Sequence, residues 1–326
     1  MDKPPAKKAA LLTKKRIITL AIFLLLIYIV APRLSSFSDS FDVAGDARPG
    51  YVAVAVVLVS ATYLFAAAIY WSLAIRPLRF RPTMLVQIAS GFTNRLLPAG
   101  LGTLTLYVQY LRKNHHSLTQ AVTVTGANSL LGMVGHGLIL ALVLIVTGNA
   151  YPAEVRLPSA AAVWLVAGGF VVVVAANLLV FRKLREYAYR ITKEVFGYAW
   201  QYRQRPHRLA IALGFSLCLT TTYVAIFYLC ALAVGAPISL AQAFLVFTIG
   251  MIAATATPTP GGLVGAEAGL TGGLIAYGVH ADTALAVALL YRFLTYWLPL
   301  LPGLMVFLRI RPLYTKVAAS AAEPRS

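Results

Sequence analysis

The sequence predicts an all-α polytopic membrane protein with six transmembrane helices and two oppositely oriented re-entrant hairpins, arranged as an inverted repeat. Three observations carry this prediction. Long apolar runs recur throughout a chain that is 60% hydrophobic and only 12% charged. Basic residues gather in short segments between these runs. Two of the runs are interrupted by proline and glycine. We expect one integral membrane domain over residues 1–326, with no large soluble domain.

The net charge of +18 does not indicate nucleic-acid binding, because the basic residues follow the positive-inside pattern of membrane topology. Cys218 and Cys230 lie in one apolar run about 18 Å apart along a helix, too far to form a disulfide. The sequence has no metal-ligand spacing, no Walker A loop and no evident nucleophile–base set. We therefore expect no metal, no cofactor and no enzymatic activity.

The first predicted crossing is the apolar run 17–30, which follows a basic, cytosolic N-terminus. A cleaved secretory signal is the alternative, since a basic start and a short apolar core fit both. The loop 33–50 is poor in positive charge and is expected outside the cell. Residues 51–75 form the second crossing, which ends at cytosolic arginines.

The next apolar segment, 83–111, is interrupted at 94–102 by Asn-Arg-Leu-Leu-Pro-Ala-Gly-Leu-Gly. Basic residues flank it at both ends, so both ends are expected in the cytosol. This pattern predicts a re-entrant hairpin, each arm of which reaches near the middle of a bilayer core about 30 Å thick. The alternative is one long tilted helix with a proline kink.

The middle of the chain contains three further crossings, predicted at 118–146, 160–181 and 209–234. Between the last two lies the basic segment 182–208, in which aromatic and aliphatic residues recur at helical spacing. This predicts an interfacial amphipathic helix suited to anionic lipid on the cytosolic leaflet. A solvated cytosolic helix is the other interpretation.

The second interrupted segment has an inward arm over 240–256 and an outward arm over 263–277. The motif that interrupts it, 257–267, overlaps the start of the outward arm. No Lys or Arg flanks it, so both ends are expected outside and the hairpin enters from the opposite side. An ordinary surface loop is the alternative. The last crossing is 284–308. Of the 28 Lys and Arg residues, all but five fall in segments predicted to be cytosolic.

The glycines of the second hairpin's outgoing arm gather near one helical face, where small residues allow another helix to approach closely. They are Gly265, Gly269, Gly272 and Gly273. Glu267 is expected to project roughly opposite that face.

The order crossing, broken hairpin, crossing occurs at 51–146 and again, inverted, at 209–308. Inverted repeats with paired broken helices are typical of transporters, whose sites lie near the midplane. When the second half is aligned on the first with an offset of 164 residues, Glu267 aligns with Thr103 and Arg292 aligns with Asn128. The first half therefore lacks a charged residue at both aligned positions. Because losing one partner of a buried ion pair is costly, we predict that Glu267 and Arg292 are paired.

Ionisable and amide residues near the breaks are the candidate substrate path, since charge inside a membrane is rare and commonly functional. They are Glu267, Arg292, Arg95, Asn94 and Asn128. The breaks themselves are assigned to proline and glycine. These residues are Pro98, Gly100, Gly102, Pro258, Pro260, Gly261 and Gly262.

Each candidate also has a structural interpretation. Glu267 and Arg292 would then only lock the fold, and Arg95 would cap the broken tip. Asn94 and Asn128 would bond backbone groups that the break leaves free. His136 is expected to be a packed helix residue.

The motif Pro258-Thr-Pro-Gly-Gly-Leu-Val-Gly-Ala-Glu267, followed by Tyr291-Arg292, resembles the transmembrane region of lysylphosphatidylglycerol synthase/flippase proteins and their stand-alone flippase-like relatives. The first-half family pattern is present in part, as Asn94, Pro98 and Gly102. Thr103 stands where that pattern has Glu, and Asn128 stands where an Arg is expected. The resemblance covers roughly residues 15–315 and implies movement of a lipid without lipid aminoacylation.

The predicted function is transbilayer movement of a phospholipid or lipid-linked intermediate through a polar groove between the two broken hairpins. A small-anion secondary transporter is the alternative, and a membrane-embedded transferase is a third. The expected partners are membrane lipids, an anionic phospholipid or a polyprenyl-linked lipid, and a homodimer is compatible with the sequence. The expected location is the plasma (inner) membrane, with both termini in the cytoplasm.

Overall fold

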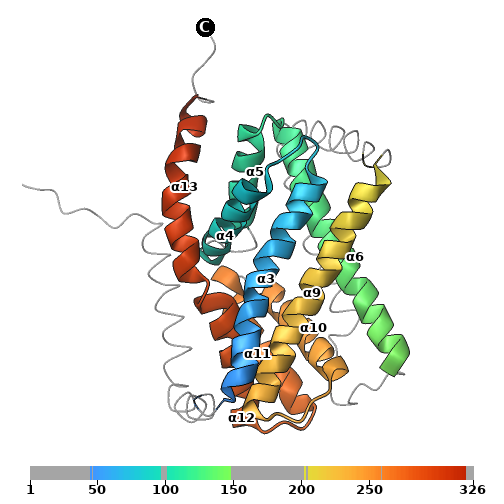
Figure 1. Ribbon diagram of the computed structural model, residues 1–326. Helices are drawn as coiled ribbons and strands as arrows, with labels where there is room; N and C mark the ends of the chain where they lie inside the picture. Colours follow the sequence, from blue (N-terminus) through green and yellow to red (C-terminus); the bar gives the residue numbers. More distant parts are fainter. Residues whose placement is uncertain are drawn as a thin grey trace, which may run out of the picture.

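The computed structural model describes residues 45, 47–96, 101–147, 202, 205–257 and 259–320, and every regular element in these ranges is helical (Figure 1). The elements in chain order are α3 (Pro49–Leu73), α4 (Phe80–Leu96), α5 (Leu101–Lys113), α6 (Leu118–Thr147), α9 (Pro206–Val234), α10 (Leu240–Ala256), η3 (Pro260–Gly262), α11 (Gly265–Ala276), α12 (Ala281–Arg292), η4 (Phe293–Trp297) and α13 (Leu300–Ser320).

Four helical stretches among the described residues are long and apolar enough to cross a membrane. They are Pro49–Leu73, Leu118–Val146, Pro206–Val234 and Ala281–Ile310, which match four of the six predicted crossings. The crossings predicted at 17–30 and 160–181 lie outside the described residues, as does most of the segment 182–208. The last span differs from the predicted single helix, because the π-helical turn η4 interrupts it.

The two interrupted segments each form a pair of short helices that fold back on one another. Helices α4 and α5 pack side by side, as do α10 and α11. A Cβ atom on Gly102 of α5 would overlap the backbone of Thr93 in α4, so the two arms are in close contact. The alternative of one long tilted helix with a proline kink over 83–111 is therefore wrong.

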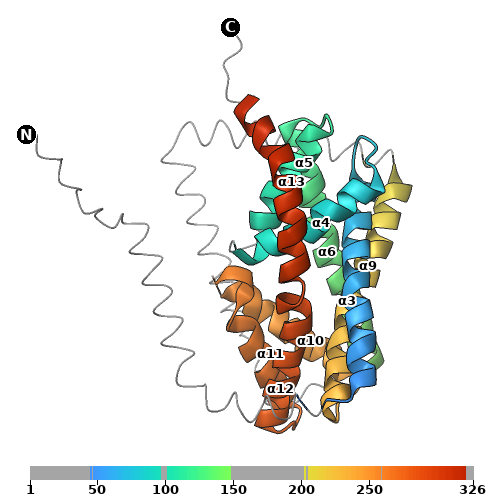
Figure 2. The same cartoon turned by 60° about the vertical axis from the view of Figure 1, so that its left-hand side comes forward.

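The two helix pairs open toward opposite ends of the molecule, and the end of α4 approaches η3 in its middle (Figures 1 and 2). Helices α3 and α9 run the full height beside both pairs and pack against each other. The buried core forms two clusters, one around each helix pair, and α3 and α9 contribute residues to both. The fold thus places the end of α4 next to the break between α10 and α11.

The second helix pair is held together through glycine. A Cβ atom on Gly269 would lie 2.7 Å from the Cβ of Ala253 in α10, and one on Gly273 would lie 3.0 Å from Val246. The approach at Gly265 is closer still, since a Cβ atom there would overlap the side chain of Thr257. The prediction that these glycines permit close helix packing is confirmed for all but Gly272, around which a Cβ would meet nothing within 4 Å.

Candidate functional site

The break between α10 and α11 has a backbone that most residues cannot adopt. Gly261 and Gly262 have φ values of 63° and 65°. Val264 has φ 72°, which is unusual for a β-branched side chain and stores strain at the start of α11. A Cβ atom on Gly261 would overlap the ring of Tyr296, so this position needs glycine for space as well as for conformation. Residues 261–264 are half-buried and Gly261 lies against Tyr296 of η4, so the break is not the exposed surface loop considered as the alternative.

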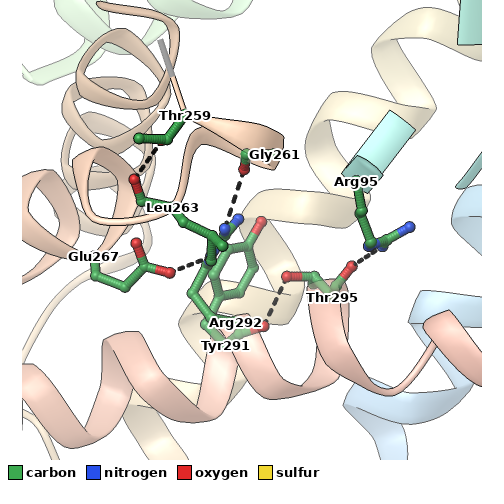
Figure 3. Close-up of polar contacts among 8 residues, drawn as sticks. All are labelled: Arg95, Thr259, Gly261, Leu263, Glu267, Tyr291, Arg292 and Thr295. Carbon is green, nitrogen blue, oxygen red and sulfur yellow. Dashed lines mark hydrogen bonds and ion pairs between the residues drawn. The ribbon is translucent and has the colours of Figure 1, made fainter. Parts of the chain in front are cut away.

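Glu267 and Arg292 form an ion pair, as the sequence predicted. Arg292 Nε donates to Glu267 Oε1 at 2.8 Å, and its Nη2 donates to the carbonyl oxygen of Gly261 at 3.1 Å (Figure 3). The two side chains are only 12% and 20% exposed. The pair therefore joins α12 to α11 and to the break that precedes it.

The second carboxylate oxygen of Glu267 is not used in this pair. Glu267 Oε2 is buried and has no hydrogen-bond partner among the described residues. Burying an anionic oxygen without a partner costs free energy, so a hydrogen bond donated to this atom would stabilise the site.

Arg95, at the end of α4, reaches across to the second half of the chain. Its guanidinium donates to the carbonyl of Gly91 in its own helix and, at 2.5 Å, to the carbonyl of Thr295 in η4 (Figure 3). Its Nε is buried without a partner among the described residues. These bonds attach Arg95 to its own helix and to η4, and they do not use its Nε–H group.

Pro299 explains why Thr295 offers its carbonyl to Arg95. In an α-helix the N–H of residue 299 would donate to the carbonyl of residue 295. Proline has no N–H, so that carbonyl is left without its helical donor. The chain turns here as a π-helix, in which the N–H of Leu298 donates to the carbonyl of Phe293 at 2.8 Å.

Tyr296 lies between the two arginines. The guanidinium carbon of Arg292 is 4.5 Å from the centre of its ring, and that of Arg95 is 5.2 Å from the same centre. Both distances are within the range of cation–π attraction. Sequence reasoning did not select Tyr296. The feature of the sequence that could have identified Tyr296 is its position four residues after Arg292, just beyond the Tyr-Arg motif.

The two asparagines have different surroundings. Asn94 adjoins Arg95 at the end of α4, and its Oδ1 is buried without a partner among the described residues. Asn128 donates to the hydroxyl of Tyr70 at 3.3 Å, and Tyr70 stacks on Tyr107. Asn128 thus lies beside the stacked rings of Tyr70 and Tyr107, and its place on a substrate path remains a prediction.

Among the residues assigned to the breaks, Gly102, Gly261 and Gly262 have described surroundings that require glycine. Pro260 begins η3. Pro98, Gly100 and Pro258 lie outside the described residues. His136 accepts or donates a hydrogen bond with Thr248 at 3.1 Å and stacks on Phe244, which is the packed role expected for it.

Apolar spanning helices, two broken helix pairs that meet inside the fold and a buried ion pair at their meeting point together define a multi-pass integral membrane protein. The chain matches the family described as the lysylphosphatidylglycerol synthase TM region over residues 16–303 and belongs to that family. The comparison with curated proteins found no match.

Proposed function

We propose that this protein moves a phospholipid or lipid-linked intermediate across the bilayer, along a polar path where the two broken hairpins meet. The family's connection with lipid chemistry supports a lipid as the substrate. Moving a headgroup through hydrocarbon is prohibitive unless the protein supplies polar partners along the way.

Arg95 is the observation that carries the proposal. The structure describes two acidic residues, Glu267, which is paired with Arg292, and Asp282, at the far end of α12. Arg95 therefore has no carboxylate partner among the described residues, and its Nε has no acceptor. A phosphate would satisfy both the charge and the donor, because guanidinium groups bind phosphate oxygens strongly.

The topology that we propose places α4–α5 and α10–α11 as re-entrant hairpins entering from opposite faces, as the two halves of an inverted repeat. Arg76 follows α3, Lys113 ends α5 and Arg208 lies in the first turn of α9, and these helix ends lie together at one end of the molecule (Figure 1). The positive-inside rule supports that end as the cytoplasmic side of the plasma membrane.

The test is reconstitution of the full chain into vesicles that contain fluorescent phospholipids, with chemical quenching of the outer leaflet. The wild-type protein should make inner-leaflet lipid accessible, and Arg95→Gln should reduce the rate at least about tenfold, because a charged hydrogen bond to phosphate is lost. Glu267→Ala and Arg292→Ala should reduce it as well.

Arg79→Gln is the matched control, since Arg79 is exposed between α3 and α4. Its rate should equal that of wild type. The proposal is wrong if vesicles with folded wild-type protein move no lipid, or if Arg95→Gln moves lipid as fast as wild type does.

A further inference from the structure

Arg95 is a half-buried cation whose charge no carboxylate neutralises in the part of the chain that the structure describes. Taking a charge out of water is costly unless a partner compensates it. The two carbonyl oxygens that its guanidinium contacts carry only partial charges. The ring of Tyr296 is a further partner, because the guanidinium carbon of Arg95 lies 5.2 Å from its centre.

An aromatic ring differs from a carboxylate as a partner for a cation. Glu267 neutralises Arg292 and accepts the hydrogen of its Nε. The face of an aromatic ring attracts a cation through its quadrupole, although the ring has no net charge. A ring therefore holds a guanidinium in place and leaves its full positive charge to attract an anion. An arginine that binds an anion only in passing needs a partner of this kind.

The ring of Tyr296 is itself fixed by its neighbours. Tyr296 is 7% exposed, and the ring lies against the backbone of Gly261, where a Cβ atom would overlap it. The ring of Trp297 lies edge-on to it, with the two ring centres 5.2 Å apart. The Tyr296 hydroxyl makes no hydrogen bond within the described ranges. The contacts of this residue are thus made by the ring and not by the hydroxyl.

Resting on the proposed function, we infer that Tyr296 is a positioning residue for the polar path. The face of its ring keeps the guanidinium of Arg95 beside the break between α10 and α11, with its charge available to the anionic headgroup. The same ring lies 4.5 Å from the guanidinium carbon of Arg292. Tyr296 therefore links the end of α4, in the first half of the chain, to the ion pair in the second half.

The test varies the electron density of the ring with little change in its size. Tyr296 is replaced in the full chain by phenylalanine and by phenylalanines that carry one, two or three ring fluorines. Fluorine withdraws electron density from the ring face and weakens its attraction for a cation. In the vesicle assay Tyr296→Phe should move lipid at the wild-type rate. The rate should then fall with each fluorine, to about one tenth with three.

Two controls distinguish this electrostatic role from packing. Phe293 lies in the same π-helical turn and is 53% exposed, so fluorination there should leave the rate unchanged. In an Arg95→Gln background the slowing caused by three fluorines at 296 should shrink from about tenfold to less than about twofold, because the cation that the ring positions is gone. A residue that only packs would slow both backgrounds equally.

The outcomes separate this inference from the proposed function. If wild type moves lipid and Arg95→Gln is slow, but the fluorinated chains move lipid as fast as Tyr296→Phe does, the positioning role is overturned and lipid movement stands. Equal slowing by fluorine with and without Arg95 also overturns it. A slow Tyr296→Phe would assign the effect to the hydroxyl instead of the ring. If wild type moves no lipid, the proposed function and the positioning role both fail.

Discussion

At the scale of single residues, the Glu267–Arg292 pair shows how much a buried charge depends on its partner. Removing one member leaves the other charge buried and unpaired, which typically costs about 3–5 kcal/mol. Removing both leaves no such charge. The structure therefore makes the effects of the two substitutions strongly non-additive.

We predict that Glu267→Gln and Arg292→Gln each lower the free energy of unfolding by more than the double substitution does. The measurement is reversible unfolding of the full chain in detergent micelles, analysed as a double-mutant cycle. The matched pair Asp282→Asn and Arg79→Gln, which are not in contact, should be additive. Additive effects of Glu267→Gln and Arg292→Gln would contradict the ion pair.

A second residue-scale prediction separates backbone strain from steric overlap. Gly261→Ala introduces both, because φ is 63° and the new Cβ would overlap Tyr296. Gly235→Ala introduces strain alone, since φ is 81° and a Cβ would meet nothing within 4 Å. Gly235→Ala should cost about 1–2 kcal/mol.

Gly261→Ala should cost clearly more than Gly235→Ala in the same unfolding experiment. Trimming the ring with Tyr296→Leu should recover part of the difference. Equal destabilisation by the two glycine substitutions would show that the contact between Gly261 and Tyr296 does not constrain the break.

At the scale of elements, the hairpin α10–α11 depends on backbone contact between its arms. Gly269→Ala places a methyl group against Ala253 and Gly250, where the nearest atoms would be 2.7 and 2.9 Å away. Overpacking of this kind typically costs about 1–3 kcal/mol. Gly272→Ala in the same helix meets nothing and should be neutral or slightly stabilising.

The comparison is made by thermal unfolding of both variants in one detergent. A lower midpoint for Gly269→Ala and an unchanged or higher midpoint for Gly272→Ala are expected. Equal midpoints would mean that the two arms separate easily and that the glycine face is not a packing surface.

The elements also show where sequence reasoning succeeds and where it stops. Proline, glycine and flanking charge were enough to predict both broken segments, because they act on the local backbone and on sidedness. The joint absence of Glu267 and Arg292 from the first half was enough to predict their pairing. Tyr296 and the π-helical turn were missed, since the place of Tyr296 between the two arginines arises only from tertiary contacts. Repeat symmetry aligned Asn128 with Arg292 but could not specify its side-chain neighbours, and its bond to Tyr70 was not foreseen.

At the scale of the whole molecule, one end is tied together by side chains from several segments. The hydroxyl of Tyr202 donates to the carbonyl of Leu73 at 2.6 Å, and Arg208 donates to that of Ala74 at 2.9 Å. His116 Nε2 accepts from the backbone N–H of Arg76 at 3.1 Å. The last turn of α3 and the residues after it are thus bonded to the α5–α6 turn and to the start of α9.

His116 makes this junction sensitive to pH. Its Nε2 accepts a hydrogen bond, so the ring is neutral, with the proton on Nδ1 facing the carbonyls of Leu111 and Asn114. Burial lowers the pKa of His116 below its usual 6.5, and the nearby Arg76 and His115 lower it further. The unfolded chain therefore binds more protons than the folded one, and stability falls as pH drops through about 6.5 toward the folded-state pKa.

We predict that the unfolding midpoint of the wild-type protein decreases between pH 7 and pH 5 and that His116→Gln removes part of this decrease. His207→Gln, at an exposed position, should retain the wild-type pH profile. The measurement is thermal unfolding at constant ionic strength across this range. Identical profiles for His116→Gln and wild type would exclude His116 as the source.

The proline at 299 has a consequence for how such chains diverge. Arg95 bonds the carbonyl of Thr295 because Pro299 leaves that carbonyl without a helical donor. In a relative with any other residue at the equivalent of 299, a backbone N–H can donate to this carbonyl. The arginine then has to share the carbonyl oxygen with that N–H. Substitutions of Arg95 and Pro299, which are 204 apart in the sequence, should therefore occur together among relatives. The residues accepted in one half of the molecule thus depend on those present in the other half.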